Sequence, residues 1–221
     1  MLILIAGITG MVGQPCSEAT ISQSHQTELS RGVDAVICAY GFLPEVSVEG
    51  QLMLLRATER AGVKIFHTAS WNYDWTLGYL GQHEAYDPYL AFHTQVRISS
   101  RIKPLFMFTG RIAEWLFSNR RDKIWDRETQ TLPCFWICTT ASDIAAYTLE
   151  AICAPGADEG GFIRVESFRF TPTQFVEAYE RARSGKVSAH LKYQGSVDDV
   201  VEMLKRARET IHPVNLEEYI G

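Results

Sequence analysis

The sequence predicts an α/β fold built on a doubly wound parallel sheet. Short unbroken apolar runs at residues 2–6 and 35–39 are typical of strands that are buried on both faces of a parallel sheet. Segments with helical spacing of apolar residues follow such runs, so strands and helices alternate along the 221 residues. This length and a hydrophobic content of 46% suit one globular domain, or one domain with a small lobe.

The first half of the chain contains two expected helices and a further strand. We expect a helix over residues 48–61, which Gly62 ends because glycine is favoured just after the last helical residue. A strand at 64–68 follows, and then a helix over 88–102 that has Pro88 in its first turn, where proline is tolerated.

The second half continues the alternation of strands and helices. Its expected elements are a strand at 103–110, a helix that begins after Thr140, a strand at 160–167, a helix from Thr171 and an amphipathic helix at 195–211. Gln174 stands three residues after Thr171, which is the spacing of a capping box at a helix N-terminus.

Composition excludes several classes of protein. A formal net charge of -5 does not indicate a broad phosphate-binding surface, so we expect no nucleic-acid partner. No segment approaches the ~20 apolar residues of a membrane span, so we expect no membrane partner. The sequence has five cysteines, an odd number, and no C-x-x-C motif, which favours a reducing, cytoplasmic location. Cys134 and Cys138 have no nearby histidine, and we expect no metal site.

The segment GITGMVG directly follows the first apolar run and has the spacing G-x-x-G-x-x-G. Glycines after a buried strand allow a tight turn, and the start of the next helix offers unpaired N–H groups to a pyrophosphate. The residues expected to bind a dinucleotide are Gly7, Thr9, Gly10, Met11, Val12, Gly13 and, after the next strand, Tyr40. A tight turn without a ligand is the alternative interpretation.

This glycine spacing, with Thr9 inside it, resembles the short-chain dehydrogenase/reductase superfamily. The segments GVDAVICAYG and RATERAGVKIFHTASW resemble its atypical branch, which is NmrA-like and isoflavone-reductase-like. The resemblance implies a Rossmann-like dinucleotide-binding domain over residues 1–155 and a small C-terminal α/β substrate lobe over residues 156–221. It also implies NADP or NAD as cofactor and a small-molecule substrate.

The interval between Gly13 and Gly32 departs from this family, because it holds only 18 residues. The family places a helix, a second strand, another helix and a third strand there, which needs on the order of 45–60 residues. The second strand would normally end in the residue that distinguishes NAD from NADP, so the cofactor preference cannot be read. A shortened fold and a segment missing from this sequence are both open explanations.

A second departure concerns the expected catalytic residues. His93 stands in HTQVR, where reductases of the family carry a lysine. It follows Tyr89 by four residues, so the two share one face of a helix. Ser70, at the end of the strand at 64–68, completes a candidate set for protonating a carbonyl oxygen or an enolate. The alternative is that Tyr89 packs in the core and His93 lies on the surface.

Aromatic residues follow the strand at 64–68, where open α/β sheets bind their ligands. Trp71, Tyr73 and Trp75 are therefore the candidate substrate-binding residues, and a planar aromatic compound would suit them. A partner surface is the alternative. Exposed aromatics and edge strands permit a homodimer, although nothing specifies one.

These patterns favour an NAD(P)-dependent oxidoreductase, a reductase or isomerase of a small aromatic or secondary-metabolite-like compound. Two alternatives stay open. One is a catalytically silent, NmrA-like regulator that senses dinucleotides, and the other is a degenerate member that has lost cofactor binding.

Overall fold

The computed structural model describes residues 1–7, 11–16, 32–41, 43, 45–76, 78–117, 131–133, 137–183 and 190–192. The chain divides into two compact units, each made of two separate stretches. The first unit is Met1–Phe108 with Ala141–Ile163, and the second is Thr109–Thr140 with Arg164–Gly221. The division into domains at residue 155 stays a prediction.

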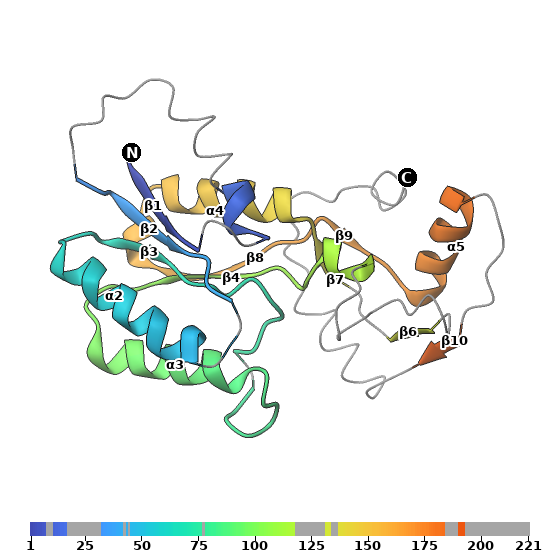
Figure 1. Ribbon diagram of the computed structural model, residues 1–221, viewed down its shortest axis with the longest axis horizontal. Coiled ribbons are helices and arrows are strands. Elements are labelled where there is room, and N and C mark those ends of the chain that lie inside the picture. Colours follow the sequence, from blue (N-terminus) through green and yellow to red (C-terminus); the bar gives the residue numbers. More distant parts are fainter. Residues whose placement is uncertain are drawn as a thin grey trace. The chain divides into compact units, whose positions relative to one another are not determined.

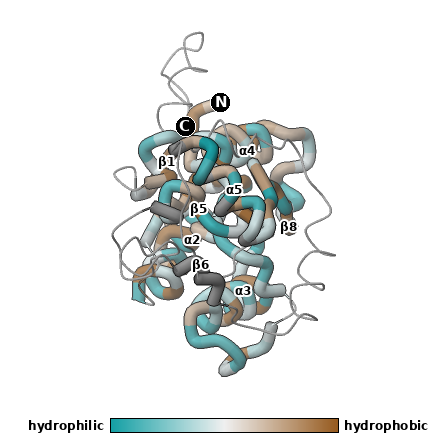
Figure 2. The backbone as a smooth tube through the Cα atoms, turned by 90° about the vertical axis from the view of Figure 1, so that its right-hand side faces the viewer, coloured by the Kyte–Doolittle hydropathy of each residue, from teal (hydrophilic) through white to brown (hydrophobic). Residues whose placement is uncertain are grey.

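A five-stranded sheet forms the centre of the first unit (Figure 1). Its strands, in spatial order, are β1 (Ile3–Ala6), β2 (Ala35–Cys38), β3 (Ile65–His67), β4 (Leu105–Phe108) and β8 (Gly161–Arg164). The pairs β1–β2, β2–β3 and β3–β4 are parallel. Each strand falls where the apolar runs of the sequence predict one, and the hydrophobic residues of β1 appear brown in Figure 2.

Helices cover both faces of this sheet, which confirms the doubly wound fold (Figure 1). The π-helical turn η1 (Val46–Gly50) runs into α2 (Gln51–Arg60), and α2 lies with α3 (Asp87–Ser99) on one face. On the other face lies α4 (Ala141–Cys153), followed by the short helix η3 (Ala157–Glu159).

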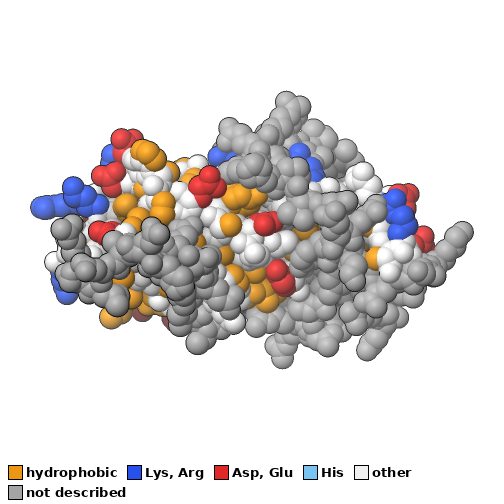
Figure 3. Space-filling model, turned by 90° about the horizontal axis from the view of Figure 1, so that it is seen from above, with side chains coloured by type: hydrophobic (Ala, Val, Ile, Leu, Met, Phe, Trp, Pro, Cys, Tyr) orange, Lys and Arg blue, Asp and Glu red, His pale blue; other side chains and the backbone are white. Residues whose placement is uncertain are grey.

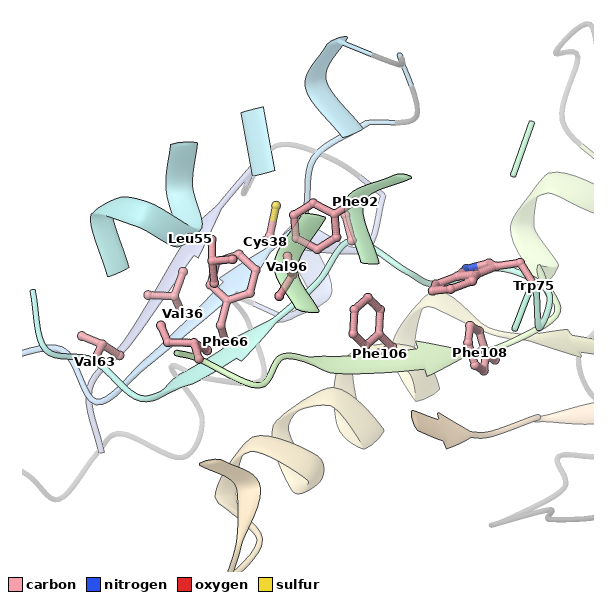
Figure 4. Packing of buried hydrophobic residues seen from close by; sticks show 12 residues of the cluster. Val36, Cys38, Leu55, Val63, Phe66, Trp75, Phe92, Val96, Phe106 and Phe108 are labelled. Atoms are coloured by element: carbon pink, nitrogen blue, oxygen red, sulfur yellow. The ribbon is translucent and has the colours of Figure 1, made fainter. Parts of the chain in front are cut away.

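The core between the sheet and α2 and α3 is built from alternate residues of the strands (Figure 4). Leu55 of α2 and Phe92 of α3 pack against it, and both are fully buried. Strand side chains alternate between faces, so Val36 and Cys38 point to this core while Ala35 and Ile37 point to the other. Burying one such side chain stabilises the fold by about 1.5–3 kcal/mol.

The second core lies between the sheet and α4. Ile37 and Leu105 contribute from the strands, and Leu149 and Ile152 contribute from the helix. All four residues of β2 are buried because both faces of this strand are covered. This burial explains why the sequence of β2 is continuously apolar, whereas a strand with one exposed face would alternate apolar and polar residues.

Two local sequence signals are confirmed. Gly62 follows α2 with a φ of +74°, the left-handed conformation that favours glycine at this place. At the start of α5 (Pro172–Arg183), the Gln174 N–H donates to Thr171 Oγ1 at 3.2 Å, and the Thr171 N–H donates to Gln174 Oε1 at 2.8 Å. This is the capping box that the sequence predicts.

One helix boundary differs from the prediction. The helix expected over residues 88–102 ends at Ser99, because Ser100 has extended backbone angles and the chain turns there towards β4. Ser100 Oγ and the Arg101 N–H both donate to the Glu59 carboxylate, and these bonds hold the turn against α2.

The second unit contains two further sheets. β5 (Arg111–Ile112), β7 (Ile137–Thr139) and β9 (Phe168–Arg169) form one, and β6 (Thr131–Pro133) pairs with β10 (His190–Lys192) in the other. The 3-10 helix η2 (Ala113–Phe117) and α5 complete the described part of this unit. The helix expected at 195–211 lies outside the described residues, as do residues 17–31 of the short interval.

The described residues contain no helix with the length and apolar content that crossing a bilayer requires. On the face seen in Figure 3, acidic and basic side chains of the described residues are interspersed with hydrophobic ones and form no continuous basic patch.

Candidate functional site

Gly7 lies at the carboxyl end of β1, and its conformation is one that other residues avoid. Its φ is +95°, and a Cβ at this position would lie 2.3 Å from the carbonyl oxygen of Ala39 and 3.3 Å from the backbone nitrogen of Tyr40. The Ala39 N–H donates to the Ala6 carbonyl oxygen at 2.7 Å. The ends of β1 and β2 therefore approach closely, and this brings the expected cofactor-binding residues Gly7 and Tyr40 together.

A helix begins at Gly13, soon after this close approach. Residues 13–16 are helical, and the Cys16 N–H donates to the Val12 carbonyl oxygen at 3.1 Å. Val12 and Gly13 are buried and Met11 is exposed, whereas Thr9 and Gly10 lie outside the described residues. The first N–H groups of a helix have no acceptor within it, so this helix start can offer donors to an anion.

Ser70 lies at the end of β3, as predicted, but its hydroxyl is held inside the protein. The Met107 N–H donates to Ser70 Oγ at 2.8 Å, and Ser70 Oγ lies 2.8 Å from Thr68 Oγ1. Thr68 Oγ1 in turn lies 3.1 Å from the Leu105 carbonyl oxygen. Thr68 Oγ1 is thus within donor distance of both Ser70 Oγ and the Leu105 carbonyl oxygen, and Ser70 Oγ also accepts from the Met107 N–H. This chain of bonds joins the end of β3 to β4.

Asn72 connects Ser70 to Tyr89. In the amide orientation that satisfies its neighbours, the Asn72 side-chain nitrogen donates to the carbonyl oxygens of Ser70 and Tyr73, at 3.1 and 3.0 Å. The Asn72 side-chain oxygen accepts from the Tyr89 hydroxyl at 3.1 Å. Two of the three expected catalytic residues are thus linked through a residue that the sequence interpretation did not select.

An aromatic cluster surrounds Trp75, which is only 3% exposed. Its other members are Tyr89 and His93 of α3, Phe106 and Phe108 of β4, and Phe162 of β8. Tyr89 stacks on Trp75 with ring centroids 6.2 Å apart, and the His93 ring lies 5.7 Å from the same indole. Tyr89 and His93 therefore both contact Trp75, which agrees with the shared helix face that their four-residue spacing predicts.

Figure 4 shows Trp75 next to Phe106 and Phe108. Phe108 is the last residue of β4, so the cluster reaches the carboxyl end of this strand, where open α/β sheets bind ligands. Phe162 stacks on Phe108 at 5.7 Å and remains 41% exposed. The cluster thus exposes the Phe162 ring, leaves Tyr89 and His93 partly exposed, and buries Trp75, Phe106 and Phe108.

The surroundings of Tyr89 and His93 favour the neutral form of each. Burial raises the pKa of Tyr89, although the hydrogen bond with Asn72 acts in the opposite direction. Burial lowers the pKa of His93, and the positive charge of Arg97 lowers it further. At neutral pH the phenol is therefore a proton donor, and the imidazole can accept or relay a proton.

Trp71 is engaged with a different part of the structure. Its indole nitrogen donates to Thr148 Oγ1 of α4 at 3.0 Å, and its ring stacks on His67 with centroids 5.1 Å apart. It does not share the contacts of Trp75 with Tyr89 and His93. Tyr73, which stands between the two tryptophans in the sequence, is partly buried. Its carbonyl oxygen accepts a hydrogen bond from the Asn72 side-chain nitrogen. Trp71 and Trp75 therefore contact different residues, and the role of Trp71, Tyr73 and Trp75 in substrate binding stays a prediction.

Sequence reasoning missed five residues of this region: Asn72, Phe106, Phe108, Phe162 and His67. Phe106 and Phe162 lie in predicted strands, and their apolar character gave no reason to separate them from the core. Asn72 gave only a weak signal, as one polar residue in the loop that follows the carboxyl end of β3.

Comparison with known proteins finds similarity in structure only. No protein-family model matches the chain, and no curated protein matches it in sequence. A structure described as AtPrR2 with NADP+ and (+)pinoresinol matches 87% of this chain and 78% of its own, with a TM-score of 0.68 and 16% identity. A leucoanthocyanidin reductase from Vitis vinifera in complex with NADPH matches 91% of this chain and 79% of its own, with a TM-score of 0.69 and 15% identity. An isoflavone reductase matches 99% of this chain and 84% of its own, with a TM-score of 0.69 and 14% identity.

At these identities the comparisons establish the fold. The chain has the Rossmann-like fold of the atypical, isoflavone-reductase-like NAD(P)-binding proteins, and the resemblance inferred from the glycine loop is confirmed at that level.

Proposed function

We propose that the chain is an NAD(P)-dependent oxidoreductase, a reductase or isomerase that acts on a small aromatic compound. The observation that carries this proposal is the contact of both Tyr89 and His93 with Trp75, near the carboxyl end of β4, in the unit that also holds Gly7. The structural neighbours whose titles name NADP+, NADPH and (+)pinoresinol support it at the level of the fold.

The residues around Gly7 fit a dinucleotide. Gly7 at the tight end of β1, the helix start at Gly13 and Tyr40 beside Gly7 are the described residues whose backbone N–H groups would hold a pyrophosphate. When bound, a reduced nicotinamide supplies a hydride. No described residue occupies the place from which the family reads the adenosine ribose, so the choice between NADP and NAD stays open.

The chain's own groups would manage the proton. Tyr89, protonated at neutral pH, would donate to the oxygen of a carbonyl or enolate once its hydroxyl turns away from the Asn72 side-chain oxygen, which accepts its proton in this structure. His93 would relay a proton from solvent to the phenolate, accepting it at one ring nitrogen while donating from the other, because its imidazole is neutral in these surroundings. Ser70 is not a direct donor in this scheme, since its hydroxyl is bonded to Met107 and Thr68.

The first experiment is a titration of the purified protein with NADPH and with NADH, followed by tryptophan fluorescence. Saturable binding of either cofactor is expected, and its absence at high micromolar concentration would dismiss both the oxidoreductase and the sensor. Such a result would favour the degenerate member. The cytoplasmic location and the homodimer stay predictions.

A regulator that senses dinucleotides without catalysis is the second candidate. The observation in its favour is the enclosure of His93 by Trp75, Phe106 and Phe162, which leaves the imidazole only partly accessible. Replacement of Tyr89 by Phe separates the two candidates, because it keeps the stacking on Trp75 and removes the proton. An enzyme would lose about 10²–10⁴-fold in turnover, whereas a sensor would keep its affinity for NADPH.

A further inference from the structure

Gln51 is a buried polar side chain at the junction of η1 and α2, with 1% of its surface exposed. Both ends of its amide are bonded. Nε2 donates to the Ser47 carbonyl oxygen at 2.7 Å, and Oε1 accepts from the Ala69 N–H at 2.9 Å. A buried amide is costly unless it is paired in this way, so its two partners are the informative feature.

One partner leads to the cofactor side of the candidate site. Ser47, itself 3% exposed, donates from Oγ to the Gly41 carbonyl oxygen at 3.1 Å. Gly41 directly follows Tyr40, whose backbone nitrogen would lie 3.3 Å from a Cβ on Gly7. Gln51 is therefore connected, through two hydrogen bonds and a short stretch of chain, to the turn that would hold the pyrophosphate.

The other partner leads to the aromatic side. Ala69 immediately precedes Ser70, whose carbonyl oxygen accepts from the Asn72 amide, and that amide holds the Tyr89 hydroxyl. The Cys38 thiol lies between the same two segments. Burial raises its pKa to about 12, and the backbone N–H groups of Tyr40 and Ala69 act against that rise.

The local helix geometry places Gln51 between these segments. Val46 and Ser47 both donate from their N–H groups to the Leu43 carbonyl oxygen, at 2.9 and 2.8 Å, where the π-helical turn η1 begins. Turns of this type are rare and occur frequently at functional sites.

We propose that Gln51 is a positioning residue that couples the cofactor-side segment, residues 39–41, to the aromatic-side segment, residues 69–73. The two segments then open and close together, and a ligand that orders one of them orders the other. The proposal rests on the proposed function for the nature of the two ligands, but the coupling itself is a property of the protein without ligand.

The first test is hydrogen exchange, measured by mass spectrometry on the protein without ligand. Gln51→Met removes both amide bonds and keeps the length of the side chain, so exchange in both segments should become at least about tenfold faster. The matched control is Thr58→Val on the same helix. Thr58 is equally buried, but its hydroxyl donates only to Leu54 within α2, at 2.8 Å. Faster exchange in one segment alone, or an equal change in the control, would overturn the proposal.

The second test adds NADPH. In the natural protein NADPH should slow exchange in both segments, and in Gln51→Met it should slow exchange in residues 39–41 only. Equal slowing of both segments in the variant would show that the coupling does not pass through Gln51. If NADPH does not bind the natural protein, the proposed function fails, and the exchange measured without ligand still decides the role of Gln51.

Ser47→Ala provides a second variant if Gln51→Met does not fold. It removes only the bond from Ser47 Oγ to Gly41, so exchange should accelerate in residues 39–41 while residues 69–73 keep their protection. Acceleration in both segments would contradict the proposed path.

Discussion

His67 should make the protein unstable at mildly acidic pH, and replacing it with Leu should remove this sensitivity. The side chain is completely buried, and neither ring nitrogen has a hydrogen-bond partner among the described residues. On its strand register it lies between Ile37 of β2 and Leu105 of β4, two apolar residues of the core under α4. Burial lowers the pKa of His67 from 6.5 to about 4, although the backbone of Thr68 acts in the opposite direction.

The direction of the effect follows from which state binds the proton. Between pH 6.5 and about 4 the unfolded chain is protonated at His67 and the folded chain is not, so acid favours unfolding. One pKa unit corresponds to about 1.4 kcal/mol, which makes the full effect about 3.4 kcal/mol below pH 4 and about 2 kcal/mol at pH 5. The stability that is present at neutral pH is therefore lost as the pH falls.

The assay is urea unfolding at pH 7.5 and at pH 5, followed by circular dichroism, on the natural protein and on His67→Leu. The free energy of unfolding of the variant minus that of the natural protein should be about 2 kcal/mol larger at pH 5 than at pH 7.5. Groups that titrate in both proteins cancel in this difference. Ile65→Leu, on the same face of β3, is the control and should show no such gain. A difference between the natural protein and His67→Leu that is the same at both pH values would refute the reasoning.

Two further predictions concern stability. Gly7→Ala should lower the free energy of unfolding by at least about 3 kcal/mol, because the new Cβ would lie 2.3 Å from the Ala39 carbonyl oxygen in a left-handed conformation. Gly62 also has a left-handed conformation but has open space around it, so Gly62→Ala should lower the free energy of unfolding by about 1–2 kcal/mol. Thermal unfolding of the two variants measures the difference. Burial alone would raise the pKa of Glu59, but bonds from Ser100, Arg56 and the Arg101 N–H lower it to about 2, so its contribution is present above pH 4.5 and is lost as the pH falls towards 2. Glu59→Gln should cost about 1 kcal/mol at pH 7 and little at pH 2, as measured by urea unfolding at both values.

The strands and helices of the first unit could be predicted because each depends on local sequence. The unbroken apolar run of β2 follows from burial on both faces, and the end of α2 follows from Gly62. The end of α3 could not be predicted, since it depends on Glu59, a residue 41 positions away from Ser100 in the sequence. The spacing of apolar residues carries no information about the Glu59 carboxylate, whose hydrogen bonds to Ser100 and Arg101 hold the turn after α3.

The candidate site was only partly predictable for a similar reason. The helical spacing of Tyr89 and His93 indicated that they share a face, and the structure places both against Trp75. The role of Ser70 could not be read from its position after a strand, because its hydroxyl is committed to the Met107 N–H on a neighbouring strand. For Trp71 the partner is Thr148, on a helix that follows 77 residues later.

The surroundings of His93 also decide what a histidine can do at the place where the resemblance to reductases predicts a lysine. A lysine ammonium would bring a positive charge to this place, whereas burial and Arg97 keep the imidazole of His93 neutral at physiological pH. The rings of Trp75, Phe106 and Phe162 around it supply no carboxylate to stabilise a cation. A reaction at this site would therefore rely on transfer of a proton through Tyr89 rather than on the attraction of a fixed positive charge. Turnover should then decline as His93 becomes protonated, at pH values below the ordinary histidine pKa of 6.5. A turnover that rises with protonation in that range would show that a positively charged imidazole is needed for the reaction.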